Sequence, residues 1–328
     1  MSLNFKKEAL YRTDLGAAYV GDSLELLAEM ADDSIDLVMT SPPFALQRKK
    51  EYGNKDEYEY ADWLATFGNL IFQKLKPTGS CVLDLGGAYR KGVPVRSLYN
   101  YRVLIKFCDE IGFHLAEEFF WFNPSKLPSP TEWVNKRKIR AKDSVNTIWW
   151  LSKSEWPKAN VSKVLAEYST KMKKLIENPE KYYTPKIRPS GHDIGSGFGK
   201  DNGGAIPSNL LQIPSSEASS KYLNICKQTG LPAHPARFPA KLPEFFIRFL
   251  TEPNDLVVDI FAGSNTTGYV AEQEGRRWLA FEERNDYLST SLIRFMQDQP
   301  LADILKAHQE LGGKLTENPP IQTDTITI

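Results

Sequence analysis

The sequence predicts an α/β fold in which a mixed, mostly parallel β-sheet carries helices on both faces and a separate module is inserted. Apolar runs of strand length alternate with amphipathic helical segments at both ends of the chain, and such alternation is typical of parallel sheets. The alternation lapses from residue 153 to 233, where Gly-rich and polar stretches replace it. A chain of 328 residues suffices for one large α/β domain with an insertion.

The first half of the chain begins with a strand, a helix and a strand. AAYVGD ends in an acid, SLELLAEM has helical spacing, and SIDLVMT is apolar enough for a buried strand. The segments that follow are a helix over 60–75, a stop at Lys76-Pro77-Thr78-Gly79, the strand CVLDLGG, a helix over 101–112, the strand HLAEEFFWF and a strand over 145–152.

Regular alternation returns at residue 234. The predicted elements of this second half are the helix LPEFFIRFL, the strand LVVDIF, the helix TTGYVAEQEG, the strand RRWLAFE and the helix NDYLSTSLIRFMQ. Residues 316–328 carry no core pattern and are predicted to be a tail.

The composition, 41% hydrophobic and 25% charged, is that of a globular protein. No apolar run approaches the roughly 18–20 residues of a membrane span, so we expect a cytoplasmic protein with no membrane partner. The three cysteines, Cys81, Cys108 and Cys226, are scattered, which predicts neither a metal site nor a disulfide framework.

The formal net charge is zero, but the charges are unevenly distributed. Lys136, Arg137, Lys138 and Arg140 crowd into WVNKRKIRAK, and further lysines follow between 171 and 186. A basic face on a neutral protein is compatible with phosphate contacts. It is equally compatible with a solvated helix surface, and charge alone leaves both readings open.

The segment VVDIFAGSNTTG has the pattern of a ligand-binding turn. Asp259 ends a buried strand, small residues lead into a helix, and Glu282 ends the next strand, where a carboxylate can bind the hydroxyls of a ribose. A nicotinamide enzyme would need G-x-G-x-x-G to hold a pyrophosphate, whereas this turn offers only Gly263 and Gly268. S-adenosylmethionine has no phosphate and fits better, although a nicotinamide oxidoreductase remains an alternative.

The segment Ser41-Pro42-Pro43-Phe44 follows the strand SIDLVMT and has the groups needed to hold an aromatic amine. The two prolines make the backbone rigid and extended, and the carbonyl of Pro42 stays free to accept a hydrogen bond. The Ser41 hydroxyl is a second acceptor, and the Phe44 ring can stack on a base. A base in duplex DNA must leave the helix before it can reach such a site.

The two motifs, in this order, resemble those of the permuted β group of DNA amino-methyltransferases. The Ser-Pro-Pro-Phe pattern is that of the N4-cytosine enzymes, whereas Asp-Pro-Pro-Tyr is commoner in N6-adenine enzymes. An N6-adenine enzyme and an inactive nucleic-acid-binding protein remain alternatives. A C5-cytosine enzyme needs a Cys after Pro, and no cysteine here follows a proline. The segments that carry the resemblance include GDSLELL, TSPPFALQRKKEYGN, GGAYRKGVP, WFNPSKLPSP, EWVNKRKIRAKD, RPSGHDI and AHPARFPAKLPEFFIR.

The resemblance implies a Rossmann-like methyltransferase fold in which the catalytic strand precedes the cofactor strand. AAYVGD then lies beside RRWLAFE, with Asp22 at the adenine ring. The domains implied are a catalytic half (1–152), a target-recognition module (153–233), a cofactor half (234–315) and the tail (316–328).

The resemblance also implies the site residues. Ser41, Pro42, Pro43 and Phe44 would be catalytic. Around the cofactor would lie Asp22, Asp259, Phe261, Ala262, Gly263, Ser264, Asn265, Thr266 and Glu282, closed over by His234, Pro235, Phe238 and Lys241. In the module, Arg188, Ser190, His192 and Asp193 could reach base edges and the lysines between 171 and 186 could contact phosphates, although each could equally be an ordinary polar loop residue. The further candidates for DNA binding are Lys136, Arg137, Lys138 and Arg140.

The partner implied is duplex DNA with a short defined site. Nearly the whole length of the chain closely resembles one member of the group, which acts on CAGCTG, and this makes CAGCTG the candidate site. Such enzymes belong to a restriction–modification system with a separately encoded endonuclease, or act as orphans, in the bacterial cytoplasm.

Overall fold

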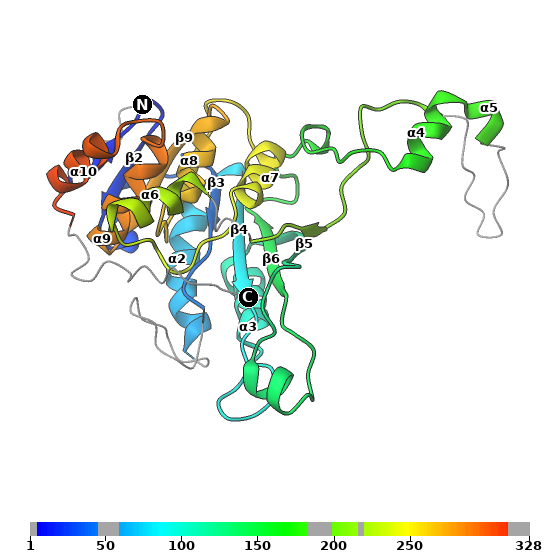
Figure 1. Ribbon diagram of the computed structural model, residues 1–328, viewed down its shortest axis with the longest axis horizontal. Helices are drawn as coiled ribbons and strands as arrows, with labels where there is room; N and C mark the ends of the chain where they lie inside the picture. Colours follow the sequence, from blue (N-terminus) through cyan, green and yellow to red (C-terminus); the bar gives the residue numbers. More distant parts are fainter. Residues whose placement is uncertain (1–4, 45–58, 183–198, 216–219, 314–328) are drawn as a thin grey trace, which may run out of the picture. The chain divides into compact units, whose positions relative to one another are not determined.

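The chain divides into two compact units, which we describe separately. A computed structural model describes residues 5–44, 59–182, 199–215 and 220–313 (Figure 1). The larger unit comprises Met1–Lys158 and Asn209–Ile328, and the smaller unit Ala159–Ser208. Within the described ranges, no helix has both the length and the apolar character needed to cross a membrane.

The larger unit is built on a mixed sheet with the strand order β1-β2-β9-β8-β3-β4-β6-β5-β7. In that order the strands are Tyr11–Arg12, Gly16–Val20, Arg277–Glu282, Leu256–Asp259, Ile35–Thr40, Leu75–Gly86, Val145–Ser152, His114–Phe122 and Leu210–Gln212. The five strands from β2 to β4 run parallel, whereas β6 runs antiparallel to both β4 and β5. The predicted mixed, mostly parallel sheet is confirmed.

Helices cover both faces of this sheet. The helices of the larger unit are α1 (Ser23–Glu29), α2 (Tyr60–Lys74), α3 (Tyr99–Lys106), α6 (Lys221–Thr229), α7 (Lys241–Leu250), α8 (Thr266–Gln273), α9 (Asn285–Ser291) and α10 (Leu301–Glu310). The predicted helix over 101–112 is α3 continued by a π-helical turn, Phe107–Ile111, which ends at Gly112 in the left-handed region (φ 98°).

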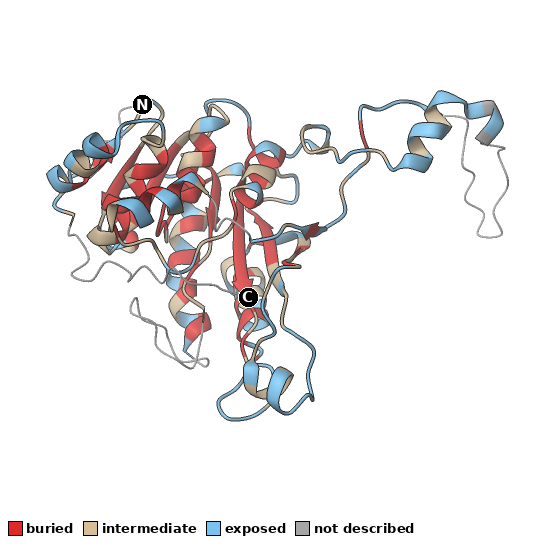
Figure 2. Cartoon of the chain, in the orientation of Figure 1, coloured by how far each residue is buried: buried red, intermediate tan, exposed pale blue. Residues whose placement is uncertain are grey.

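The central strands β3 and β8 are buried on both faces, because their side chains point alternately to the two faces of the sheet and helices cover each face (Figure 2). Val38 of β3 belongs to the same apolar core as Leu64 of α2 and Val103 of α3. On the opposite face α7 supplies aromatic rings, with Phe246 lying 5.2 Å from the ring of Phe119. These central strands therefore appear in the sequence as continuous apolar runs.

The permuted order of the motifs brings distant segments together. β3, near residue 40, pairs in parallel with β8, near residue 258. β2 pairs in parallel with β9, so that Val20 lies opposite Glu282. The β2–β9 neighbours are those the resemblance implied, and the carboxyl ends of β2, β9, β8, β3 and β4 meet at one edge of the sheet.

The segment Lys76–Gly79, predicted to be a helix stop, lies inside β4 instead. The pairing with β3 shifts register there, from Ile35 opposite Leu75 to Leu37 opposite Ser80. Lys76 reaches back to Asp36, with 2.7 Å between Nζ and Oδ2. A buried carboxylate such as that of Asp36 needs a cationic or hydrogen-bonding partner. The bulge in β4 allows Lys76 to be that partner while the strand stays in the sheet.

The smaller unit contains a short 3-10 turn (Val161–Lys163) and helices α4 (Thr170–Glu177) and α5 (Pro179–Tyr182). It is held by a bridge between Ala166 and Ala205 and by the Asn202 N–H, which donates to the Tyr168 hydroxyl at 2.7 Å. This unit is shorter than the predicted module 153–233, because β7 and α6 belong to the larger unit. The tail 316–328 lies outside the described residues.

The start of β2 allows a test of the packing. A Cβ atom at Gly16 would lie 2.3 Å from ring atoms of Trp278, which is fully buried and stacked on Phe295. We expect Gly16→Ala to lower the free energy of unfolding by about 1–3 kcal/mol through overpacking. Gly21→Ala, just beyond the other end of β2, is the control because its Cβ would meet the flexible end of Lys7 at 3.2 Å and make ordinary van der Waals contact with Leu26 at 3.5 Å. Chemical denaturation of both variants measures the difference, and equal stabilities would contradict this packing.

Candidate functional site

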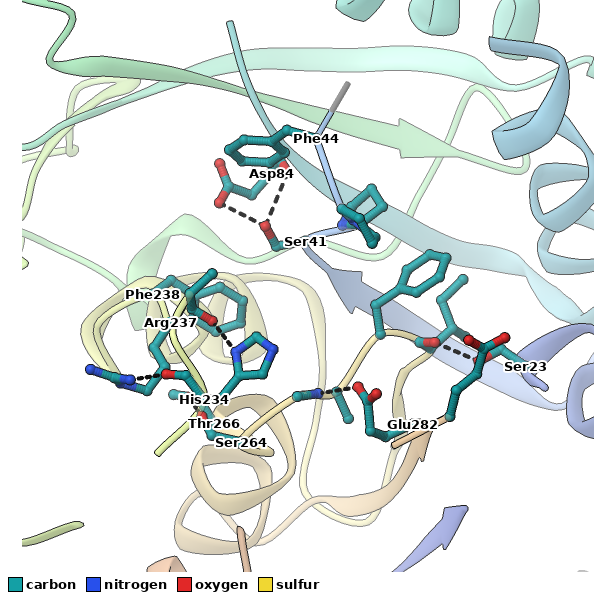
Figure 3. A pocket seen from close by; sticks show the side chains of 18 of the residues that line it. Ser23, Ser41, Phe44, Asp84, His234, Arg237, Phe238, Ser264, Thr266 and Glu282 are labelled. Carbon is teal, nitrogen blue, oxygen red and sulfur yellow. Dashed lines mark hydrogen bonds between the residues drawn. The ribbon is translucent and has the colours of Figure 1, made fainter. Parts of the chain in front are cut away.

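A cavity of about 680 Å³ opens at the carboxyl ends of the parallel strands. Residues of both sequence motifs line it, together with the first turn of α1 and the segment before α7 (Figure 3). The predicted residues that line it are Asp22, Ser41, Pro42, Pro43, Phe44, His234, Pro235, Phe238, Phe261, Ala262, Gly263, Ser264, Thr266 and Glu282. The fold therefore joins the two motifs into one site.

At the catalytic end, the Ser41 hydroxyl is held by Asp84. Ser41 Oγ lies 3.2 Å from Asp84 Oδ2 and 3.3 Å from the Asp84 carbonyl oxygen (Figure 3). When the hydroxyl donates to this carboxylate, its lone pairs remain available to accept from a ligand amine. The Ser41 hydroxyl is thus oriented to accept a hydrogen bond from a ligand amine, which is the role that the sequence suggests for it.

Asp84 is a buried carboxyl group in β4, two residues before the strand ends. Asn146 of the neighbouring strand β6 donates to Asp84 Oδ1 at 3.0 Å. Burial raises the pKa of Asp84 to about 6, and the hydrogen bonds from Asn146 and Ser41 lower it less than burial raises it. Near neutral pH this group is an ionised carboxylate that gains a proton readily.

Two aromatic residues bound the same end of the cavity. The Phe44 ring lies against the backbone of Gly86, where a Cβ atom would stand 2.4 Å from the ring. Trp121 of β5 lines the cavity, and its indole N–H is fixed by the Ile213 carbonyl at 2.8 Å. Flat side chains held in this way suit a flat aromatic ligand.

At the other end, Glu282 receives hydrogen bonds from two backbone N–H groups. Oε2 accepts from Gly263 at 2.8 Å, and Oε1 accepts from Arg284 at 3.0 Å. Burial raises the pKa of Glu282, and these two hydrogen bonds oppose that effect. Each carboxylate oxygen keeps capacity to accept from a ligand hydroxyl.

His234 packs over the glycine turn. A Cβ atom at Gly263, which has φ +51°, would lie 3.1 Å from the His234 ring. The ring is fixed by the Ala236 carbonyl, 2.5 Å from Nδ1, and by the Tyr287 ring with centroids 4.5 Å apart. The segment before α7 thus lies directly against the turn, as expected for a segment that closes over a ligand.

Asp259 does not line the cavity, although the sequence placed it at the cofactor. Its carboxylate is fully buried and accepts from Thr40 Oγ1 and Thr267 Oγ1, both at 2.7 Å, and from the Phe261 N–H at 3.1 Å. Burial raises the pKa of this group. Asp259 therefore joins the end of β3 to the start of α8 beneath the site.

Two other predicted cofactor residues also lie outside the cavity lining. Asn265 is the buried N-cap of α8, accepting from Gly268 N at 3.0 Å and donating to the Tyr11 hydroxyl at 2.9 Å. Lys241 is the exposed first residue of α7. The turn needs Asn265 for its own shape, since the residue adopts φ +50° there.

The basic residues of WVNKRKIRAK lie on the exposed loop between β5 and β6. Lys136 and Arg137 pair with Glu132 at 3.3 and 3.0 Å. Arg140 donates to the Pro94 carbonyl at 2.7 Å and so helps to fasten the loop, whereas Lys138 is exposed. Four further predicted DNA-binding residues, Arg188, Ser190, His192 and Asp193, lie outside the described residues.

The sequence reasoning did not identify Asp84, Asn146 or Trp121. Asp84 carried a usable signal, because an acid near the end of the buried strand CVLDLGG lies at the ligand-binding edge of such a sheet. Asn146 and Trp121 sit on the antiparallel strands β6 and β5, and their neighbours across the sheet become known only from the strand register.

Comparison with known proteins identifies the family of this site. Residues 35–292 match the family described as DNA methylase, which covers N6- and N4-specific enzymes. The chain is 66% identical to the type II methyltransferase M.PvuII of Proteus hauseri, over 90% of this chain and 88% of the relative. It is 25% identical to M.ScaI of Streptomyces caespitosus, over 87% of this chain and 82% of the relative.

The solved structures agree. The structure of the PvuII DNA methyltransferase, described as cytosine-N4-specific, matches with a TM-score of 0.78 and 54% identity, covering 95% of this chain and 98% of that chain. The predicted Rossmann-like methyltransferase fold and the predicted resemblance to the PvuII modification methyltransferase are confirmed. The chain belongs to the DNA methylase family of N6- and N4-specific amino-methyltransferases.

Proposed function

We propose that this enzyme transfers a methyl group from S-adenosylmethionine to the exocyclic N4 of a flipped cytosine in duplex DNA. The observation that carries the proposal is that one cavity contains both ends of the site. Ser41 and Asp84 line its catalytic end, and Glu282 and Gly263 line its cofactor end. The cytosine-N4 specificity named for the solved relative supports the choice of base. The Ser-Pro-Pro-Phe motif supports the same base.

The residues at the Glu282 end fit the cofactor. Glu282 can accept from the two ribose hydroxyls, and Asp22 stands beside it across the β2–β9 pair. The turn 261–264 contributes backbone and small side chains, which suit a ligand without phosphates. When bound, S-adenosylmethionine supplies an electrophilic methyl group.

The residues at the Ser41 end fit an amine that must lose a proton. The Ser41 hydroxyl and the Pro42 carbonyl accept the two amine hydrogens and orient the nitrogen lone pair. As the nitrogen takes the methyl group, the bond from that methyl to the sulfur of S-adenosylmethionine would break and leave its electron pair on sulfur. The nitrogen becomes positive and releases one proton to the Ser41 oxygen, while the Ser41 hydroxyl proton passes to Asp84. Phe44 and Trp121 hold the ring of the base.

Duplex DNA with a short defined site, for which CAGCTG is the candidate, is the proposed substrate. We assign recognition of the DNA sequence to the smaller unit and its flanking segments. We assign the phosphate contacts to the basic residues of the loop between β5 and β6. The enzyme would act in the bacterial cytoplasm, within a restriction–modification system or as an orphan.

Removal of the Ser41 hydroxyl tests the catalytic end alone. We expect Ser41→Ala to slow methyl transfer by about 10²–10⁴-fold, because the amine loses its acceptor and its route to Asp84. Cofactor affinity should persist, since Glu282 and Gly263 are untouched. Single-turnover kinetics and calorimetric titration measure the two quantities, and loss of cofactor binding would contradict this role.

The raised pKa of Asp84, about 6, predicts a pH dependence. A carboxyl group gains its proton as the pH falls, so the rate of methyl transfer should decrease below about pH 6 and level off above it. Asp84→Asn should give a slow rate without this inflection. Single-turnover rates across the pH range decide the matter, and an unchanged inflection in Asp84→Asn would assign it to another group.

Neutralising Glu282 tests the cofactor end. Gln keeps the size but has one acceptor oxygen for two backbone N–H groups, so we expect Glu282→Gln to weaken S-adenosylmethionine binding about 10–100-fold. Glu283→Gln removes the same charge from an exposed residue of the cavity lining and serves as the control. Equal losses in both variants would show that charge alone, and not this carboxylate, matters.

Sequencing the DNA of an expressing host by a modification-sensitive method tests the base and the site together. We expect N4-methylcytosine, because the Ser-Pro-Pro-Phe motif and the cytosine-N4 specificity named for the solved relative favour that base, and CAGCTG is the candidate site. Label on adenine N6 would identify the alternative enzyme class. A cytosine in another motif would leave the chemistry intact and correct the recognition site.

A further inference from the structure

Flipping a base out of duplex DNA leaves a gap in the base stack, and proteins often fill such gaps with an apolar side chain. The cavity described above accepts the flipped base but cannot occupy the space that the base has left. We propose that Leu127 is the side chain that enters the DNA stack at that gap. This inference rests on the proposed function.

Leu127 lies on the loop that leaves the sheet beside the catalytic end of the cavity. β5 carries Trp121 in the cavity wall and ends at Phe122. The next residue, Asn123, is still held to the sheet, since its N–H donates to the Ser144 carbonyl at 2.9 Å. Lys126 is close enough for its charge to lower the pKa of Asp84.

Leu127 is 81% exposed, although hydrogen bonds hold the loop on either side of it. The carbonyl before it, of Lys126, accepts from Lys142 Nζ at 3.3 Å, and the carbonyl after it, of Pro128, accepts from Asn135 Nδ2 at 3.1 Å. A single exposed leucine needs no explanation by itself. One that is presented rigidly beside a base pocket has the properties of a wedge.

The charges of the same loop favour DNA as the occupant. Lys136 and Lys138 are exposed on it, and lysines near an inserted side chain can hold the phosphates on either side of a gap. Other apolar side chains of this region are less exposed, with Val95 at 50% and Ile139 at 47%. The geometry therefore favours Leu127 over its neighbours.

Trp156 provides a matched control. It is 84% exposed, but it follows β6 at the opposite edge of the sheet. Lys158, two residues further on, forms an ion pair with Asp255 at 2.6 Å. Asp255 precedes the first residue of β8, so this pair lies at the end of the strand opposite to the one that lines the cavity. Trp156→Ala therefore removes an equally exposed apolar side chain away from the base.

The experiment compares two duplexes containing the methylated site found by sequencing. In one the target cytosine is paired, and in the other it faces an abasic position, which lowers the cost of flipping. We expect Leu127→Ala to lower the single-turnover rate on the paired duplex by about 10-fold or more and to restore most of it on the second duplex. Leu127→Phe should retain the rate on both, and Trp156→Ala should match the wild type.

A fluorescent readout reports flipping without turnover. A duplex with 2-aminopurine at the target position should brighten when it binds the wild-type enzyme and brighten less with Leu127→Ala at saturating protein. Equal loss of rate on both duplexes, or no loss on either, would overturn the wedge. A wild-type enzyme that methylates neither duplex would overturn the proposed function itself, so the two failures can be told apart.

Discussion

The site depends on one buried carboxylate that is not part of its lining. Asp259 at the end of β8 accepts from Thr40, the last residue of β3, and from Thr267 in the first turn of α8, both at 2.7 Å. Ser41 follows Thr40 directly, and the glycine turn lies between Asp259 and Thr267. The position of the acceptor hydroxyl relative to the cofactor turn is thus fixed by three side chains in an interior that water does not reach. A buried carboxylate that lost one of these donors would keep its desolvation cost without the compensating hydrogen bond.

Three carboxyl groups of this site have a pKa raised by burial, but they differ in how their oxygens are used: Asp259 and Asp84 are buried, and Glu282 is half-buried. Asp259 lies beneath the cavity and meets only protein donors. Glu282 and Asp84 lie in the cavity wall, so their remaining acceptor capacity faces the cavity. In the proposed mechanism the same carboxyl group would therefore be a hydroxyl acceptor at Glu282 and a proton acceptor at Asp84, whereas at Asp259 it joins two elements of the protein.

The sequence predicted the elements that periodicity and motif order determine. The strands around Val38 and Val258 were recognisable as buried apolar runs, and the neighbours β2 and β9 followed from the permuted order. The place of Asp259 beneath the cavity was not predictable in this way, because a residue in the cavity wall and a buried one both appear as an acid at the end of a strand. Asn146 and Trp121 were not predictable either, since their position depends on the register of antiparallel strands that no local pattern records.

The geometry of the site explains why the catalytic and cofactor strands can occur in permuted order along the chain. The groups of the site are held by hydrogen bonds between neighbouring strand ends, and these bonds do not depend on which strand the chain forms first. Glu282 is fixed through Gly263 and Arg284, and Ser41 through Asp84, each by contacts at the sheet edge. A change in connectivity moves the loops at the far edge and leaves this edge intact. The loop that carries Leu127 connects the antiparallel strands β5 and β6 at the active edge, so the part of the enzyme that meets the DNA stack can vary without disturbing the clamp beneath it.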